Sequence, residues 1–217
     1  MGILGKRVTY DIQQNLEECR ILAKSNPNYY NLDVACGLKK LANLYKADNR
    51  LEEAEKAYCE ALELYRELAK INSTIFNPYI ATILDNLAIL YSDAKRIKEA
   101  EIAYNEVLEL YRDLAKLNST IFNPDVATTL DSLALLYADT NRLNEAEKAY
   151  DEALELYRVL LNIDSKRYGV DYANSIVFAF FCTSKSKYDL SEAKEILQLY
   201  RGVPRAKQLL EFIDDLS

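Results

Sequence analysis

The stretch from Glu63 to Pro78 reads ELYRELAKINSTIFNP, and the stretch from Glu109 to Pro124 reads ELYRDLAKLNSTIFNP. The two stretches differ at two positions and lie 46 residues apart. The same offset relates a set of tyrosines in three successive segments, Tyr58, Tyr104 and Tyr150. A constant offset that holds at many positions indicates an internal repeat, in which each unit folds alike and packs on its neighbours.

The repeat divides the chain into regular and atypical parts. We predict one solenoid domain over residues 1–217, because the chain is long enough for one uninterrupted stack of repeats. Its parts are an N-terminal capping helix at 11–26, regular repeats at 27–72, 73–118 and 119–164, and a degenerate repeat with a C-terminal capping helix at 165–217. Atypical ends are expected, since a terminal unit must present one face to water.

Each unit carries two helical patterns. In the second unit, apolar and small residues recur at steps of three and four, at Ala81, Leu84, Leu87, Ala88 and Tyr91 and, after a break at 92–96, at Ile97, Ala100, Tyr104, Val107, Leu108 and Tyr111. This spacing places each set on one face of a helix, and neither set alternates as a strand would. The pattern therefore predicts a pair of helices per unit, with the recurring tyrosines packed against the next unit.

The helix starts have local signals of their own. Asn77 precedes Pro78 and Asn123 precedes Pro124, which is the order of an N-cap residue followed by a proline in the first turn. We therefore predict helix starts at these two asparagines. The NST triplets at Asn72 and Asn118 match a glycosylation acceptor, but with no secretory signal before them we expect capping and turn residues there.

Composition excludes several classes of function. The 34 acidic residues outnumber the 27 basic ones, so the net charge is −7 and the average field repels nucleic acids and anionic lipid surfaces. Histidine is absent and the four cysteines form no Cys-x-x-Cys pair, so we expect no metal site, no cofactor and no enzymatic activity. No uncharged apolar run approaches the ~18 residues that span a bilayer, and we expect a soluble, cytoplasmic protein.

The pattern of large and small residues resembles a known family. The run from Ala127 to Tyr157, ATTLDSLALLYADTNRLNEAEKAYDEALELY, is similar to the tetratricopeptide repeats with longer units that occur in kinesin light chains and in many bacterial proteins. The resemblance implies an all-α, right-handed solenoid of stacked antiparallel helix pairs. It also implies a noncatalytic scaffold, whose first helices line a concave groove that binds a protein or peptide.

Residues outside the packing face of each first helix are the candidates for this groove. The predicted partner-binding residues are Lys39, Asn43, Thr82, Asp85, Asn86, Ile89, Thr128, Asp131, Ser132 and Leu135. If the first helices face inward, the first unit is basic and the next two are acidic with apolar points, which suits a segment with basic and apolar residues. The alternative is a solvated face without a ligand.

Three of these residues invite a more specific comparison. In chaperone-binding members of the family, a lysine and an asparagine on one first helix and an asparagine on the next hold a peptide's C-terminal carboxylate, and Lys39, Asn43 and Asn86 match those positions. Such donors would converge on one anion. Thr128 and Ser132, however, stand where those members carry further cations.

The C-terminal part leaves two alternatives open. The segment 176–182, IVFAFFC, is more apolar than its counterpart in the preceding repeat. Either a last helix near Arg205 to Leu216 covers it, or it is a site for a partner or for self-association, which would make the protein a homo-oligomer through its C-terminal end. Beyond a scaffold, the sequence is also compatible with a regulatory or sensor subunit that binds a peptide or small ligand, and with a self-assembling structural protein.

Overall fold

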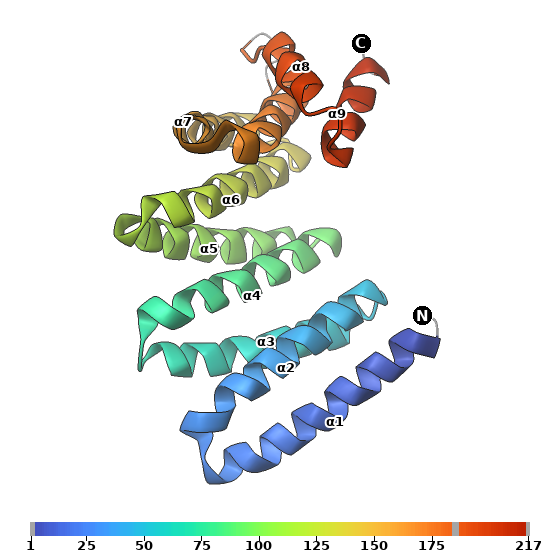
Figure 1. Cartoon of the computed structure of the whole chain (residues 1–217), viewed down its shortest axis with the longest axis vertical. Helices are drawn as coiled ribbons and strands as arrows, with labels where there is room; N and C mark the ends of the chain where they lie inside the picture. The colour runs from blue at the N-terminus through green and yellow to red at the C-terminus, as the bar shows by residue number, and fades with distance from the viewer. Residues whose placement is uncertain (1–2, 184–186, 216–217) are drawn as a thin grey trace. The chain divides into compact units, whose positions relative to one another are not determined.

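A computed structural model describes residues 3–183 and 187–215, and these residues form nine helices and no strand (Figure 1). The helices are α1 (Ile3–Ser25), α2 (Pro27–Ala47), α3 (Leu51–Ala69), α4 (Ser73–Asp93), α5 (Ile97–Leu117), α6 (Ser119–Asp139), α7 (Leu143–Cys182), α8 (Leu190–Leu199) and α9 (Pro204–Asp215). The predicted fold class, an all-α stack of helix pairs, is confirmed. The chain divides into two compact units, residues 1–110 and 111–217, which are described separately below.

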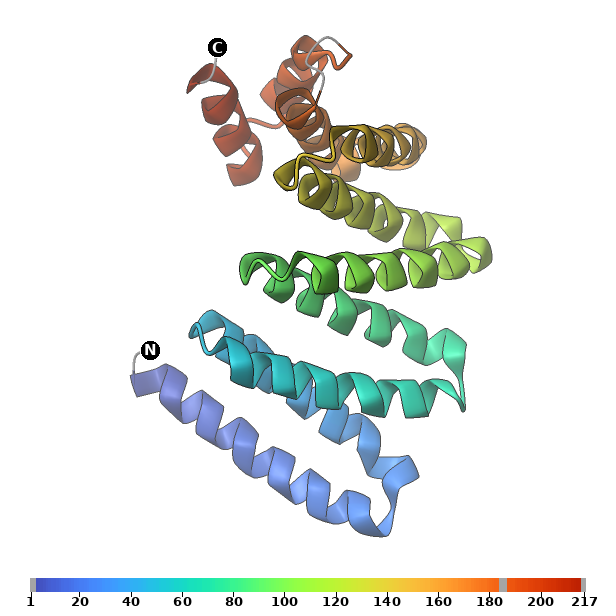
Figure 2. The ribbon, with the colours of Figure 1, turned by 180° about the vertical axis from the view of Figure 1, so that it is seen from behind.

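In unit 1, residues 1–110, successive helices run antiparallel and pack side by side, α1 on α2, α2 on α3 and α3 on α4 (Figures 1 and 2). Tyr58 and Tyr65 of α3 are completely buried, as are the small residues Ala54 and Ala61 of the same helix. Small residues let the backbones approach, and the tyrosines fill the space around them. The packing predicted for the repeat is therefore present in this unit.

In unit 2, residues 111–217, α6 packs on α7, α7 on α8 and α8 on α9. The long helix α7 is two helices joined at Asp164, whose φ of −153° and ψ of 91° are not helical. The part before this kink, 143–163, is the second helix of the third repeat, and the part after it, 165–182, begins the degenerate repeat. The kink thus continues the alternation of first and second helices.

The junction between repeats is an N-cap that recurs every 46 residues. The Asn72 side chain accepts a hydrogen bond from the backbone N–H of Ile75 at 3.2 Å, and Asn118 accepts one from Ile121 at 3.2 Å. Asp164 accepts one from the N–H of Arg167 at 3.1 Å. Each bond satisfies one of the N–H groups that have no partner at a helix start. The expectation that Asn72 and Asn118 are capping residues is confirmed.

The predicted helix starts at Asn77 and Asn123 are wrong. The helices begin at Ser73 and Ser119, so Pro78 and Pro124 lie inside α4 and α6. Pro78 lacks the N–H that would bond to the carbonyl four residues earlier. That carbonyl belongs to Thr74, which is exposed and open to water, so the helix continues through the proline.

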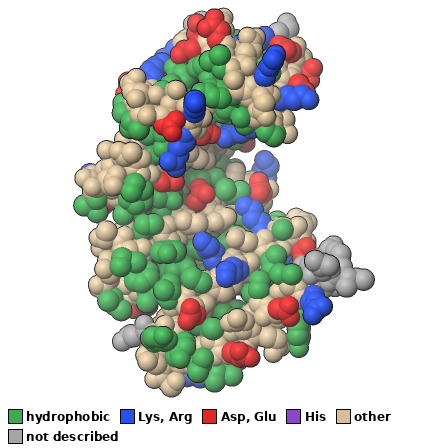
Figure 3. Space-filling model, in the orientation of Figure 1, with side chains coloured by type: hydrophobic (Ala, Val, Ile, Leu, Met, Phe, Trp, Pro, Cys, Tyr) green, Lys and Arg blue, Asp and Glu red, His purple; other side chains and the backbone are tan. Residues whose placement is uncertain are grey.

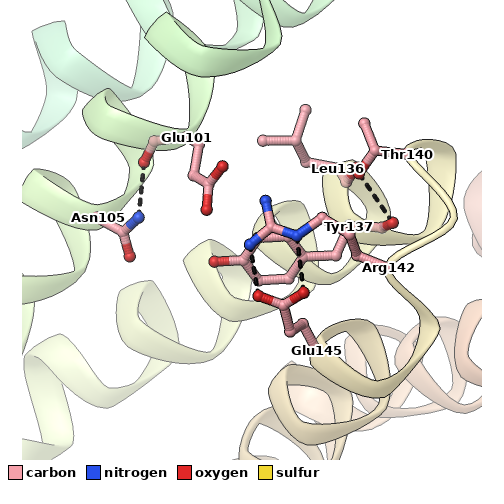
Figure 4. A network of polar contacts seen from close by, with 7 residues as sticks. All are labelled: Glu101, Asn105, Leu136, Tyr137, Thr140, Arg142 and Glu145. Atoms are coloured by element: carbon pink, nitrogen blue, oxygen red, sulfur yellow. Dashed lines mark hydrogen bonds and ion pairs between the residues drawn. The ribbon is translucent and has the colours of Figure 1, made fainter.

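The turn within each helix pair also repeats. In the third pair, Arg142 N–H bonds to the carbonyl of Tyr137 at 2.8 Å across Asn141, whose φ is +60°. This is the Schellman ending of a helix, in which one residue adopts the left-handed conformation. The Arg142 guanidinium lies 4.3 Å from the centre of the Tyr137 ring and pairs with Glu145, as Figure 4 shows.

The other two turns have the same geometry. Asn49 and Lys95 hold the left-handed position, with φ of 58° and 59°. Arg50 and Arg96 lie 4.2 Å and 4.3 Å from the ring centres of Tyr45 and Tyr91 respectively. Figure 4 also draws a separate contact in α5, where the Asn105 amide donates to the carbonyl of Glu101 at 2.9 Å. The 46-residue period therefore holds for the individual residues of these turns.

Ion pairs join successive second helices inside each unit. In unit 1 Arg20 pairs with Glu60 and Arg66 with Glu106, each at 2.6 Å. In unit 2 Arg112 pairs with an acidic residue of α7 in the same register. All are exposed to solvent, and such pairs contribute at most about 1 kcal/mol each. They mark the register of the stack more than they stabilise it.

The N-terminal helix begins earlier than the expected capping helix at 11–26. α1 starts at Ile3. Gln13 donates a hydrogen bond to the hydroxyl of Tyr45 at 2.9 Å, and Thr9 is buried. These contacts place residues 9–13 of α1 against the end of α2.

At the other end, α9 lies over the apolar segment 176–182. The ring of Phe212 is 5.3 Å from that of Phe181 and 6.5 Å from that of Phe178. Of the two alternatives left open by the sequence, coverage by the last helix is what the structure shows. Phe212 stays 40% exposed, so the cover is partial.

Two further features concern the surface. No helix within residues 3–183 and 187–215 is long and apolar enough to cross a membrane. On the face drawn in Figure 3, acidic and basic side chains are interspersed.

Candidate functional site

A cavity of about 340 Å³ lies in unit 2, between α6, the two parts of α7 and α9. We call it the C-terminal cavity. Its lining residues are Thr128, Asp131, Ser132, Leu135, Tyr150, Tyr157, Asp171, Asn174, Phe178 and Arg205. The first four of these are all the predicted partner-binding residues of the third repeat. They line it together because they lie at steps of three and four on α6 and so share one face of that helix.

Asp131 is the acidic centre of this cavity. Its carboxylate accepts a hydrogen bond from the Ser175 hydroxyl at 2.6 Å and another from the Tyr157 hydroxyl at 3.2 Å. Removal from water raises the pKa of Asp131 to about 7, although both hydrogen bonds favour the charged form. The residue as a whole keeps partial exposure, because one side of it faces the cavity. Asp131 is therefore a fixed acceptor that exchanges its proton near neutral pH.

Tyr150 is the second unusual group. Its side chain is 1% exposed, and its hydroxyl has no hydrogen-bond partner among the described residues. Burial, followed by the nearby Cys182 and Asp131, raises the pKa of Tyr150. The Cys182 thiol lies close enough to contribute to this shift, but a thiol is only a weak hydrogen-bond partner for a hydroxyl.

The register of the repeat explains why Tyr150 lacks a partner. In unit 1 the equivalent Tyr58 donates a hydrogen bond to Asn43 at 2.5 Å. The residue that corresponds to Asn43 in the third repeat is Leu135, which has no polar atom. The side chain that satisfies the first tyrosine is thus absent beside the third one.

One side of the cavity is closed by an ion pair. Arg205 at the start of α9 contacts Asp171 of α7 at 2.5 Å. Asn174 and Phe178 follow Asp171 along the same helix face and add an amide and an aromatic ring to the lining. The cavity therefore combines two carboxylates, one balanced guanidinium, several hydroxyls and an apolar wall.

The predicted residues of unit 1 lie on two first helices, Lys39 and Asn43 on α2 and the other four, Thr82, Asp85, Asn86 and Ile89, on α4. The Asn86 amide donates to the backbone carbonyl of Thr82 at 2.8 Å, and the Thr82 hydroxyl donates to that of Pro78 at 2.8 Å. The Asn43 oxygen is used by Tyr58. The Asn86 amide has two N–H groups and uses one of them on its own helix, and the carboxylate-binding arrangement stays a prediction.

Several residues of the cavity are not among those predicted. Tyr150 and Tyr157 belong to the face expected to pack, and both are buried. Their recurrence every 46 residues gave a signal for position but none for hydrogen bonding. Asp171 and Asn174 lie 46 residues after Asp125 and Thr128, so the repeat offset could have pointed to them, whereas Arg205 comes from the last helix, where the offset has decayed.

The hydroxyls that α6 contributes to the cavity donate to the backbone of their own helix. In the part of the chain that the structure describes, no group of three histidine, cysteine or acidic side chains could hold a metal ion. The hydroxyls of Thr128 and Ser132 donate to carbonyls of their own helix at 2.9 Å and 3.1 Å.

Comparison with protein families agrees with this geometry. The model of the family described as "Tetratricopeptide repeat" matches residues 38–73, 80–119 and 126–165. The chain belongs to the tetratricopeptide repeat family. Members of this family generally serve as scaffolds for protein–protein interaction. No curated protein matches the chain.

Solved structures show the same tetratricopeptide fold. BtubC (BKLC) from P. vanneervenii is 20% identical, with a TM-score of 0.54 over 98% of this chain and 93% of that protein. A putative kinesin light chain from Podosopora anserina, with nearly identical repeats, is 17% identical, with a TM-score of 0.52 over 95% of this chain and 92% of the other. At these identities the likeness concerns the fold alone.

Proposed function

We propose that this tetratricopeptide protein is a noncatalytic scaffold that binds a segment of a partner protein along the first helices of its repeats. The contact residues would be the predicted ones on α2 and α4 in unit 1 and on α6 in unit 2. The helix pairs of each unit hold these residues in place before the partner arrives, so binding costs little conformational entropy.

The observation that carries this proposal is the C-terminal cavity. Its lining includes Thr128, Asp131, Ser132 and Leu135, and none of them belongs to the buried apolar core. A concave site with an apolar wall and a few polar groups is the usual form of a binding site. The alternative of a solvated face without a ligand does not call for a hollow at this place.

Charge along the first helices favours a partner segment of mixed character. The first repeat offers Lys39 and the amide of Asn43, while the second and third offer Asp85 and Asp131 beside the apolar Ile89 and Leu135. An acidic residue of the partner would suit the first repeat, and basic and apolar residues would suit the other two. Complementary charge of this kind selects a partner.

Capture with groove variants tests the proposal. The full chain is immobilised and exposed to native lysate as the wild type, as Lys39→Glu or as Leu135→Glu. We expect a set of retained proteins whose recovery falls about tenfold with either variant, because each change reverses a charge or charges an apolar contact.

Two matched variants serve as controls. Lys98→Glu and Leu143→Glu make the same chemical changes on second helices, at exposed positions of α5 and α7. Circular dichroism establishes that all four variants fold. Proteins retained equally by the groove variants and their controls would contradict the proposal.

A further inference from the structure

The C-terminal cavity has an unbalanced negative charge. Asp131 and Asp171 bring two carboxylates to its lining, and Arg205 brings one guanidinium. That guanidinium is bound to Asp171 at 2.5 Å, so its charge is already balanced. The charge left over belongs to Asp131 of α6, the first helix of the third repeat.

An independent feature points to a ligand in the same place. Tyr150 is buried, lines the cavity and has a hydroxyl without a hydrogen-bond partner in the described part of the chain. A buried hydroxyl without a partner is unfavourable. A ligand that donates a hydrogen bond to this oxygen would relieve that cost.

The hydrogen bonds that Asp131 already accepts favour an ammonium over a guanidinium as the bound cation. One oxygen of Asp131 already accepts from Ser175 and the other from Tyr157. A guanidinium prefers two parallel bonds to a free carboxylate edge, whereas an ammonium is a compact point charge with three donors that rotate freely. An ammonium can therefore approach Asp131 and Tyr150 without a fork-shaped opening.

The remaining lining suits an alkyl stem. Leu135 and Phe178 form the apolar wall, and Leu135 is 40% exposed, so it also meets a segment that lies on the surface of α6. Aliphatic stems of basic residues commonly pack on apolar surface while the charged end finds polar partners. The volume of about 340 Å³ is at the lower end of the range of small-ligand sites.

We propose that the C-terminal cavity binds the alkylammonium group of a lysine side chain in the partner segment, with Asp131 as counter-charge, the Tyr150 hydroxyl as acceptor, and Leu135 and Phe178 against the stem. This inference rests on the proposed function, because it names the residue that the partner inserts. Asp131 and Tyr150 are then the residues that determine specificity.

The test titrates the full chain with small probes at low ionic strength, followed by two-dimensional NMR. The probes are blocked lysine (N-acetyl-lysine methylamide) and blocked norleucine, which has a similar stem and no charge. We expect blocked lysine to shift the amide signals of Ser132 and Asn174, and blocked norleucine to require about tenfold higher concentration. Equal binding of the two probes would overturn the proposal.

Variants locate the contact. Asp131→Asn keeps the shape of the side chain and is expected to weaken blocked lysine about tenfold, and Tyr150→Phe about threefold. Asp113→Asn removes the same charge from an exposed position of α5, and it should leave binding unchanged. Wild-type affinity in Asp131→Asn would overturn the proposal whether or not Tyr150→Phe has an effect.

Proton release gives a readout that a merely structural Asp131 would not produce. Arg205 and the hydroxyls of Tyr157 and Ser175 favour the charged carboxylate, and Asp171 opposes it. A bound ammonium adds a further positive charge and should expel the proton that part of the population carries at pH 7. Calorimetry in two buffers of different ionisation enthalpy should detect this release in the wild type and none in Asp131→Asn.

Two comparisons distinguish a lysine site from a site for a small free amine and from the scaffold proposal. Tighter binding of free 1,5-diaminopentane than of blocked lysine would assign the cavity to a small amine and overturn the peptide source. If blocked lysine binds but the groove variants capture the same proteins from lysate as the wild type, the scaffold proposal is contradicted. The preference of the cavity for an ammonium is then still supported. If the groove variants lose captured proteins but blocked lysine does not bind, the scaffold proposal is supported and the lysine site is contradicted.

Discussion

At the scale of single residues, the second-helix tyrosines show how one repeated side chain acquires different surroundings. Tyr58 donates to Asn43, while Tyr150 in the same register finds no partner among the described residues. Tyr65 lies 3.3 Å from the Cys36 thiol, and its counterpart Tyr157 donates to Asp131. The backbone period fixes where each ring packs. The variable residue on the facing first helix decides what its hydroxyl meets.

The two tyrosines therefore predict opposite effects of the same substitution. Tyr58→Phe removes a hydrogen bond and should lower the free energy of unfolding by about 1 kcal/mol. Tyr150→Phe removes a hydroxyl that has no partner in the described part of the chain, so stability should stay the same or rise slightly. Urea unfolding followed by circular dichroism measures both. A loss for Tyr150→Phe as large as that for Tyr58→Phe would show that the Tyr150 hydroxyl has a stabilising contact.

Asp131 predicts a dependence of stability on pH. Its folded-state pKa of about 7 lies above the value of about 3.9 in an unfolded chain. Between these values the folded state holds the proton more tightly, so the contribution of Asp131 to stability falls as the pH rises from about 4 to about 7. Unfolding by urea at several pH values across this window should show this fall in the wild type.

The comparison with Asp131→Asn isolates this group from the other carboxylates. The variant cannot titrate at this position, so its stability relative to the wild type should increase as the pH rises. Asp125, whose pKa is also raised by burial, is present in both proteins and cancels in the difference. A difference that does not change with pH would contradict the prediction.

At the scale of secondary-structure elements, the junction between repeats controls where each first helix begins. Asn72 and Asn118 have the same dihedral angles, φ −151° and ψ 92°, and Asp164 has nearly the same. An extended residue with a side-chain acceptor ends one helix pair and starts the next. The proline that follows lies inside the helix and does not set its start.

This interpretation predicts that two neighbouring asparagines differ in importance. Asn72→Ala removes the cap of α4 and should lower the free energy of unfolding by about 1 kcal/mol. Asn77→Ala lies within the helix, where alanine is the better helix former, and should be neutral or stabilising. Thermal and urea unfolding of both variants tests this. A larger loss in the free energy of unfolding for Asn77→Ala than for Asn72→Ala would instead support a helix start at Asn77.

The helix pairs were predictable from sequence because burial repeats every three or four residues. The same reasoning located the break between α4 and α5 at 92–96, which agrees with α4 ending at Asp93 and α5 starting at Ile97. The helix starts were not predictable, since an asparagine before a proline and an asparagine before Ser-Thr both carry capping chemistry. Which of the two asparagines caps the helix depends on how far the packed face of that helix extends towards its N-terminus.

At the scale of the whole molecule, regularity is lost towards the C-terminus, and with it predictability. The first-helix residues of the third repeat could be proposed as binding residues from their register. Asp171 was within reach of the same register, because it lies 46 residues after Asp125, but Arg205 was not, because the offset decays before the last helix. The closing side of the C-terminal cavity is thus made by the part of the chain that departs most from the repeat.

The last helix predicts a local effect on integrity. Phe212 packs on Phe178 and Phe181, so Phe212→Asp should loosen α9 and increase the rate of proteolysis in the 200–204 connection several-fold. The helices of unit 1 should be cleaved at the wild-type rate. Limited proteolysis followed by mass spectrometry measures both rates.

A matched substitution distinguishes loss of packing from added charge. Val203→Asp introduces the same carboxylate next to α9 at an exposed side chain, where it should have little effect. Equal acceleration by Val203→Asp and Phe212→Asp would show that the aromatic contacts do not hold the helix in place.

The near-identical junctions at Asn72, Asn118 and Asp164 have a consequence for how such a chain changes over generations. A cassette from Ser73 to Asn118 ends on the same residue type as the one that precedes it. Duplication or excision of that cassette in the gene would rejoin an asparagine to a serine in the original conformation. The number of repeats can therefore change by recombination while the N-cap junction between repeats stays the same.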